Sequence, residues 1–120
     1  MATWDDVSRL ALALPAATET GRTWKVKEKS FAWERPLRKK DLADLGDAAP
    51  DGPILCVRTD GVGPKETLLA DSPHIYFTTP HFNGYPAVLL RLDEIGVDEL
   101  GEILEEAWTV QAPKRLLREL

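Results

Sequence analysis

Two strand-like segments joined by a short polar corner constrain the fold of this 120-residue chain more than any other feature. The segments cover residues 75–79 and 87–92, and both are rich in aromatic, β-branched or leucine side chains. Between them, Asn83 and Gly84 can supply the positive φ angles that a tight reversal requires. Strands joined by so short a reversal run antiparallel. We therefore expect an antiparallel sheet, in which residues 87–92 are partly buried on both faces.

A second hairpin and a further strand extend this sheet. Large apolar and charged side chains alternate over residues 24–34, with a charged reversal near Lys27 to Lys29, which predicts a hairpin. The apolar run over residues 53–58 predicts a central strand. Cys56 stands inside this run and is the only cysteine, so we expect a buried thiol with no internal disulfide.

Helical patterns occupy much of the remaining chain. Thr3 can cap a helix that runs to about Leu14, with Asp6 completing an acidic capping box. A short helix over residues 37–45 should turn Leu42 and Leu45 inward. Further helices are predicted over residues 64–69, 98–110 and 114–120. The buried stripe of the longest comprises Leu100, Ile103, Leu104, Ala107 and Trp108.

The order of these elements predicts an α+β fold with two layers. The strands come in hairpins, and no regular strand–helix–strand crossover pattern emerges. We therefore expect an antiparallel sheet of about five strands with helices packed on one face. A mass of 13.4 kDa is that of one ordinary domain, so residues 1–120 are predicted to form a single domain.

Composition and the N-terminal residues bear on the location of the protein. Hydrophobic residues make up 43% of the chain and charged residues 29%, which is typical of globular proteins. No apolar stretch approaches the ~20 residues that a bilayer-spanning helix needs. The N-terminus lacks the basic start of a secretory signal. We therefore expect a soluble, cytoplasmic protein with no membrane partner.

Positive charge is concentrated in residues 22–40. This segment holds eight Lys or Arg residues and two Glu residues, a local charge of +6, whereas the whole chain carries −5. Cations interleaved with Trp24, Phe31 and Trp33 could contact phosphates and stack on bases. Lysines on an edge hairpin can also serve only to prevent aggregation between sheets. The nucleic-acid-binding hypothesis assigns six residues: Lys25, Lys27, Lys29, Arg38, Lys39 and Lys40.

The corner offers an alternative site. His81 could contact a ligand or act as a general base, and with Tyr85 it could line a small polar pocket. In the alternative, structural interpretation, His81 simply caps the reversal, and Thr78 and Thr79 satisfy backbone groups of the turn, as threonines commonly do.

Motifs for catalysis and metal binding do not occur. Residues 61–66 follow a strand and precede a helix, but they depart from both the dinucleotide fingerprint and the Walker loop. The serines lack nucleophile-elbow glycines, and the glutamates of the longest helix have no histidine at ligand spacing. We therefore expect a protein that is not an enzyme and needs no metal or cofactor.

Four motifs distributed over most of the chain suggest a family: Phe31-Ala32-Trp33, Thr78-Thr79-Pro80-His81-Phe82, Gly84-Tyr85-Pro86, and Trp108 followed by Ala112-Pro113-Lys114-Arg115. They resemble the MmcQ/YjbR family (DUF419) of small bacterial proteins. The resemblance implies an α+β fold like that of secretion chaperones and DNA binding by paired hairpin wings. Such a fold would also suit a protein-interaction module. Only Lys27-Glu28-Lys29 is available at the tip of the first hairpin, so that wing should be short.

Overall fold

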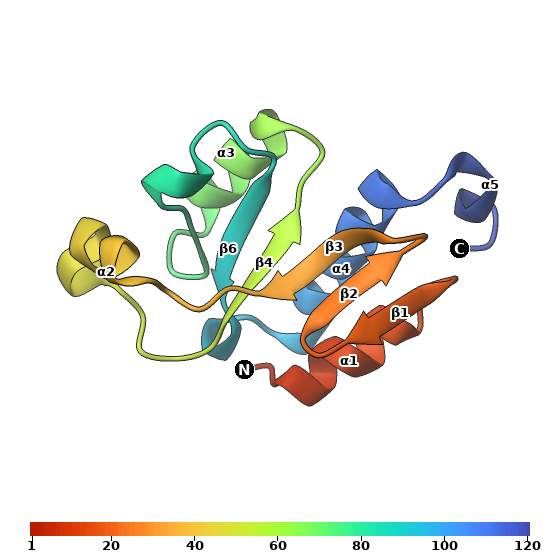
Figure 1. Cartoon of the computed structure of the whole chain (residues 1–120), viewed down its shortest axis with the longest axis horizontal. Coiled ribbons are helices and arrows are strands. Elements are labelled where there is room, and N and C mark those ends of the chain that lie inside the picture. Colours follow the sequence, from red (N-terminus) through yellow and green to blue (C-terminus); the bar gives the residue numbers. More distant parts are fainter.

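The computed structural model describes residues 1–120, apart from the side chain of Ala48. Within the described residues, six strands form one sheet in the order β1-β2-β3-β4-β6-β5, with every neighbouring pair antiparallel (Figure 1). The predicted α+β fold and antiparallel sheet are confirmed. The strands are β1 (Ala17–Thr20), β2 (Thr23–Val26), β3 (Lys29–Glu34), β4 (Ile54–Arg58), β5 (Tyr76–Phe77) and β6 (Ala87–Arg91).

The described chain also contains five α-helices. They are α1 (Trp4–Leu12), α2 (Lys39–Leu45), α3 (Val62–Asp71), α4 (Val97–Gln111) and α5 (Lys114–Leu117), with 3₁₀ turns at Gly46–Ala48, Pro80–Phe82 and Leu92–Glu94. Helices α1 and α4 pack against the sheet and against each other. All five residues of the predicted α4 stripe are buried. No helix in the described chain is long and apolar enough to span a membrane.

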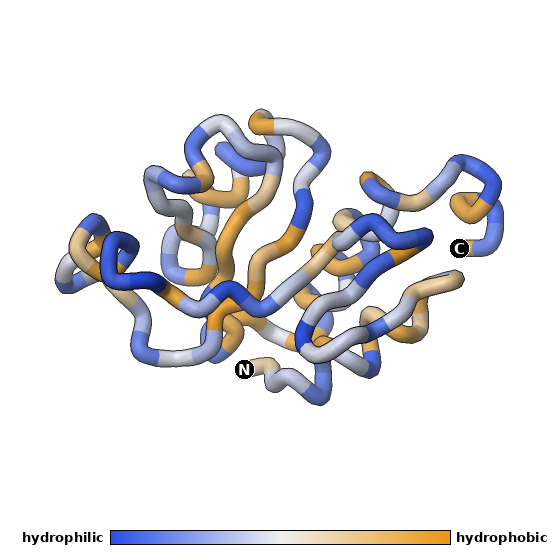
Figure 2. Tube along the Cα trace, in the orientation of Figure 1, coloured by the Kyte–Doolittle hydropathy of each residue, from blue (hydrophilic) through white to orange (hydrophobic). Residues whose placement is uncertain are grey.

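The sheet separates two hydrophobic clusters. The larger joins α1 and α4 to one face of the sheet, with Leu55 of β4 and Leu90 of β6 fully buried in it. The smaller lies on the opposite face, where Cys56 and Leu89 pack with Phe82. Figure 2 shows that hydrophobic residues occupy much of β4 and β6, whereas the β2–β3 turn is hydrophilic. The strands expected at the centre of the sheet are therefore buried on both faces.

Several predicted element boundaries were wrong. Strand β1 was not predicted, because its sequence Ala-Thr-Glu-Thr is polar and the strand is mostly exposed. The strand expected over residues 75–79 is reduced to β5, since a 3₁₀ turn begins at Pro80. The face of the sheet opposite α1 and α4 is also covered. Leu37, just before α2, and Leu45, the last residue of α2, pack against the smaller cluster there.

Helix α2 also presents a different side chain to the interior than predicted. Leu42, expected to face inward, is 47% exposed, whereas the preceding Asp41 is only 4% exposed. A buried carboxylate requires a compensating partner. Arg35 supplies it, at 3.0 Å from Asp41. The apolar pattern of α2 could not reveal this ion pair.

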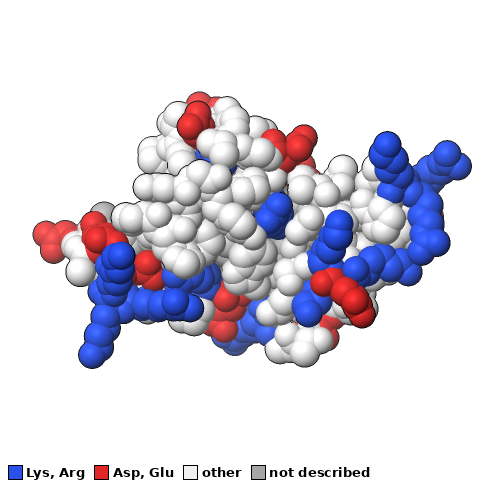
Figure 3. Space-filling model, turned by 45° about the horizontal axis from the view of Figure 1, so that its top comes forward, with Lys and Arg blue, Asp and Glu red and all other residues white. Residues whose placement is uncertain are grey.

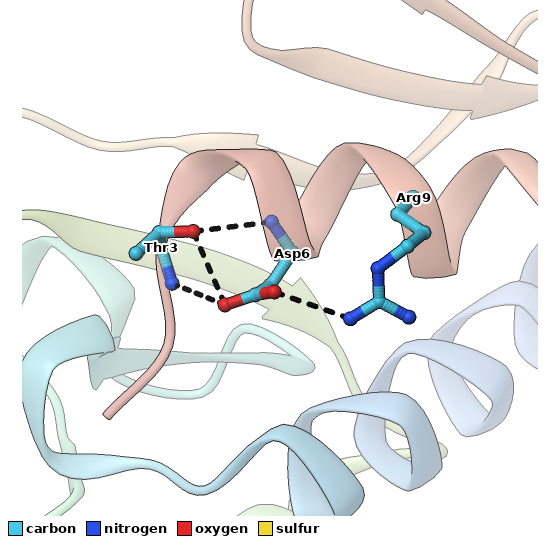
Figure 4. Close-up of polar contacts among 3 residues, drawn as sticks. All are labelled: Thr3, Asp6 and Arg9. Atoms are coloured by element: carbon cyan, nitrogen blue, oxygen red, sulfur yellow. Dashed lines mark hydrogen bonds and ion pairs between the residues drawn. The ribbon is translucent and has the colours of Figure 1, made fainter.

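The start of α1 has the predicted capping box (Figure 4). The Asp6 backbone N–H donates to Thr3 Oγ1 at 3.3 Å, and the Thr3 backbone N–H donates to Asp6 Oδ2 at 2.9 Å. Arg9 pairs with the same carboxylate at 3.1 Å. The pKa of Asp6 is lowered, mainly by the hydrogen bond from the Thr3 backbone and next by the hydrogen bond from the Arg9 side chain.

Replacing Thr3 with alanine should lower the free energy of unfolding by about 1 kcal/mol, because the cap hydroxyl is lost. Urea denaturation followed by circular dichroism measures this change. Thr3→Ser keeps the hydroxyl and should remain close to the parent protein. Equal losses in both variants would show that the hydroxyl cap does not stabilise the helix.

Candidate functional site

The structure divides the six predicted nucleic-acid-binding residues into two groups. Lys25, Lys27 and Lys29 lie in the β2–β3 hairpin, and Arg38, Lys39 and Lys40 lie at the start of α2. The molecule measures 43 × 28 × 24 Å, and α2 and the β2–β3 turn lie at opposite ends of its longest axis (Figure 1). The basic segment therefore does not form one patch.

The hairpin exposes its lysines through a tight two-residue turn. Lys27 and Glu28 both have positive φ, at 48° and 71°, as a type I′ turn requires. Lys27, within this turn, and Lys29, directly after it, are both exposed. Lys25 pairs with Thr18 of β1 and Ser30 of β3, on the face of the sheet opposite α1 and α4. Hydroxyl groups thus flank the lysine that lies within the sheet.

Helix α5 brings further positive charge to the hairpin end. The Gln111 side chain at the end of α4 donates to the Ser30 carbonyl at 2.9 Å, and Leu116 of α5 is buried in the larger cluster. Figure 3 shows Lys and Arg side chains gathered at this end, and a second group at the α2 end. The hairpin-end patch, as we call it, comprises Lys25, Lys27, Lys29, Lys114, Arg115 and Arg118.

The patch could not be assembled from the sequence, because its two halves lie about 85 residues apart along the chain. The Ala112-Pro113-Lys114-Arg115 motif was noticed only as a family resemblance. Its basic composition was the one signal that could have drawn attention to α5.

A buried ion pair fixes the start of α2 at the other end. Asp41 accepts from the Arg35 guanidinium at 3.0 Å and from the Arg38 backbone N–H at 2.9 Å. The pKa of Asp41 is lowered, mainly by the hydrogen bond from the Arg38 backbone N–H. Burial acts in the opposite direction, and the charges of Arg35 and His81 lower the pKa further. The cap uses the backbone of Arg38, so its side chain is not needed to hold α2 in place.

The corner forms one wall of a cavity of about 570 Å³, which we call the corner pocket. His81 packs edge-on against Phe82, with ring centroids 5.1 Å apart. The Tyr85 hydroxyl accepts from Arg58 Nη1 at 2.8 Å, and the Arg58 guanidinium also lies over the tyrosine ring. The structure thus brings the two candidate ligand residues to one cavity. Its lining comprises Trp33, Glu34, Arg35, Pro36, Leu37, Arg38, His81, Phe82 and Tyr85.

A buried lysine, Lys65, forms hydrogen bonds with backbone carbonyl groups of the corner. Lys65 of α3 is 3% exposed, and its ammonium donates to the Phe82 carbonyl at 2.5 Å and the Tyr85 carbonyl at 3.0 Å. Burial lowers the pKa of Lys65. Lys65 lies within the helix predicted over residues 64–69, but its partners are carbonyl groups 17 and 20 residues later in the chain, so the sequence pattern did not predict this contact.

Cys56 and a groove between α3 and α4 lie outside these two sites. Burial raises the pKa of the Cys56 thiol to about 12, so the thiolate needed for nucleophilic attack is disfavoured. The described residues contain no group of three His, Cys, Asp or Glu side chains arranged to hold a metal ion. A groove of about 880 Å³ between α3 and α4 includes Asp60, Glu105 and Glu106 in its lining, which disfavours nucleic acid there.

Comparisons with known proteins place the chain among bacterial relatives. No family model matches it. It is 52% identical over 122 residues to the uncharacterized proteins Rv2570 of Mycobacterium tuberculosis and Mb2600 of Mycobacterium bovis, covering 98% of this chain and 95% of each relative.

A solved structure extends this likeness to the fold. The crystal structure of Deinococcus radiodurans protein DR2400, a DUF419 domain, aligns with a TM-score of 0.67 and 22% identity, covering 99% of this chain and 88% of that one. The fold expected from the MmcQ/YjbR resemblance is confirmed. The chain belongs to the same family as these mycobacterial proteins and has the fold of the DUF419, or MmcQ/YjbR-type, domain.

Proposed function

We propose that this protein is a non-enzymatic DNA-binding protein whose principal contact is the hairpin-end patch. The observation that supports this function is the gathering of six cations from two distant chain segments. Five of them are exposed and Lys25 is half-buried. In the described chain, none of the six forms an ion pair with a carboxylate. Unpaired Lys and Arg side chains can neutralise phosphates and release the counterions that surround DNA.

The polar face of the hairpin supports the same role. Thr18 and Ser30 flank Lys25, and serine and threonine hydroxyls commonly bond to phosphate oxygens. The only acidic side chains in the two segments that form the patch, residues 25–29 and 114–120, are Glu28 and Glu119. The local charge is therefore positive although the whole chain carries −5, so binding should weaken sharply as salt increases.

Salt titration of a labelled DNA duplex, followed by fluorescence anisotropy, tests this function. If all six cations contact phosphates, the logarithm of the binding constant should fall against the logarithm of salt with a slope of about −5. Reversing Lys27 and Lys29 to glutamate should weaken binding strongly and reduce the magnitude of the slope by about 2.

The matched control reverses Lys39 and Lys40 to glutamate, because it changes the net charge equally at the opposite end. Circular dichroism should show that both variants are folded. A smaller loss in the control supports the hairpin-end patch. Equal losses would point to net charge alone, and a larger loss in the control would assign the principal contact to α2. Failure of the parent protein to bind duplex at low salt would contradict DNA binding itself.

A further inference from the structure

The walls of the corner pocket come from two segments that are far apart in the sequence and held together by fixed contacts. Residues 33–38 form one side, and the corner residues 81–85 form the other. The Arg35 guanidinium lies 5.3 Å from the centre of the Phe82 ring and is itself anchored by Asp41. Lys65 fixes the carbonyls of the corner. A pocket held in this way is formed before a ligand arrives, which lowers the cost of binding.

The lining combines aromatic surface with polar groups. Trp33 is half-buried, and Tyr85 is 42% exposed with its ring held by Arg58. Phe82 lies between His81 and Tyr85, in ring contact with both. A cavity of about 570 Å³ falls within the range of small-molecule sites, and such sites commonly pair aromatic walls with a few polar groups.

The charges of the pocket favour an anion. Asp41 neutralises Arg35, and Arg22 pairs with Glu34 at 3.0 Å. Arg38 is exposed, and no carboxylate lies within ion-pairing distance of it in the described part of the chain. It therefore contributes an uncompensated positive charge to the lining of the pocket, which also includes His81. A guanidinium binds a carboxylate through two parallel hydrogen bonds, which fixes the orientation of the bound group.

We infer that the corner pocket binds a small planar aromatic carboxylate. The carboxylate group meets Arg38 and His81, and the rings lie against Trp33 and Tyr85. This site is separate from the hairpin-end patch, so a negative result for one proposal does not contradict the other.

Naphthoate and its neutral amide are matched probes, because they share the same rings and differ in charge. Ligand-observed NMR or calorimetry with the full chain should detect binding of naphthoate and a weaker response to the amide. Arg38→Gln should weaken naphthoate binding by about tenfold or more, the effect of one hydrogen bond to a charged group, and leave the amide unchanged. Tyr85→Ala should weaken both probes.

Arg118→Gln is the matched control, because it removes one positive charge from the hairpin-end patch at the opposite end. It should leave naphthoate affinity unchanged. The inference is overturned if naphthoate does not bind, if acid and amide bind equally, or if Arg38→Gln and Arg118→Gln have the same effect. Circular dichroism should show that the Arg38→Gln variant is folded, since the cap of α2 uses the backbone N–H of this residue.

Discussion

Replacing Trp108 with alanine is expected to lower the free energy of unfolding by about 4 kcal/mol, which is a large share of the 5–15 kcal/mol typical of small domains. The indole is fully buried in the larger cluster, so its removal leaves a cavity between α4 and the sheet. Its Nε1–H also donates to the Pro15 carbonyl at 3.0 Å, which ties the end of the α1 segment to α4. Chemical denaturation followed by far-UV circular dichroism measures the loss.

Two further variants separate the causes of this loss. Trp108→Phe keeps most of the packing but leaves the Pro15 carbonyl without its donor, so a smaller loss of about 1–2 kcal/mol is expected. Thr109→Ala changes the next residue, which is exposed on the same helix, and should alter stability by less than about 0.5 kcal/mol. A loss below about 1 kcal/mol in Trp108→Ala would contradict the central role of this indole in the core.

Periodicity predicted the parts of the fold in which burial follows a regular pattern. All five residues of the α4 stripe are buried, because a helix against a sheet must turn one continuous face inward. The apolar runs of β4 and β6 were likewise informative, because these neighbouring strands are covered on both faces. The capping box of α1 was predictable because its partners lie only three residues apart.

Elements stabilised by distant partners could not be predicted in this way. Strand β1 has little buried surface and is defined by its pairing with β2. Asp41 is buried because Arg35 lies beside it, and hydropathy cannot reveal such compensation. Lys65 is buried because its ammonium donates hydrogen bonds to two carbonyl groups of the corner, which lie 17 and 20 residues later in the sequence.

The candidate sites show the same limitation. The nucleic-acid-binding hypothesis grouped cations of residues 22–40 because they lie close together in the sequence, but β3 carries the chain from the hairpin end toward α2. The hairpin-end patch instead includes Lys114 and Arg115 of α5 and Arg118 directly after this helix, and no cation of α2. His81 and Tyr85 were identified as candidates, whereas the opposite wall of their pocket comes from residues more than 40 positions earlier.

Replacing Asp41 with alanine should lower the free energy of unfolding by about 3 kcal/mol, at the low end of the range for breaking a buried ion pair. The change leaves the Arg35 guanidinium, which is largely buried, without its carboxylate, and it removes the acceptor of the Arg38 backbone N–H. Replacing Arg35 with methionine in the same chain removes the uncompensated charge. We therefore expect the double variant to lose less than the two single variants added together.

The pH dependence of Asp41→Asn provides an independent measure of the same contact. Because the folded structure lowers the pKa of Asp41, its carboxylate stabilises the fold above its ordinary pKa of about 3.9, and this stabilisation is lost as the pH falls through the lower folded value. The difference in stability between the parent protein and Asp41→Asn should therefore be largest near neutral pH and shrink in acid. Asp6, whose pKa is also lowered, contributes equally to both chains and cancels from this difference. A difference that stays constant from neutral to strongly acidic pH would show that the charge of Asp41 does not stabilise the fold.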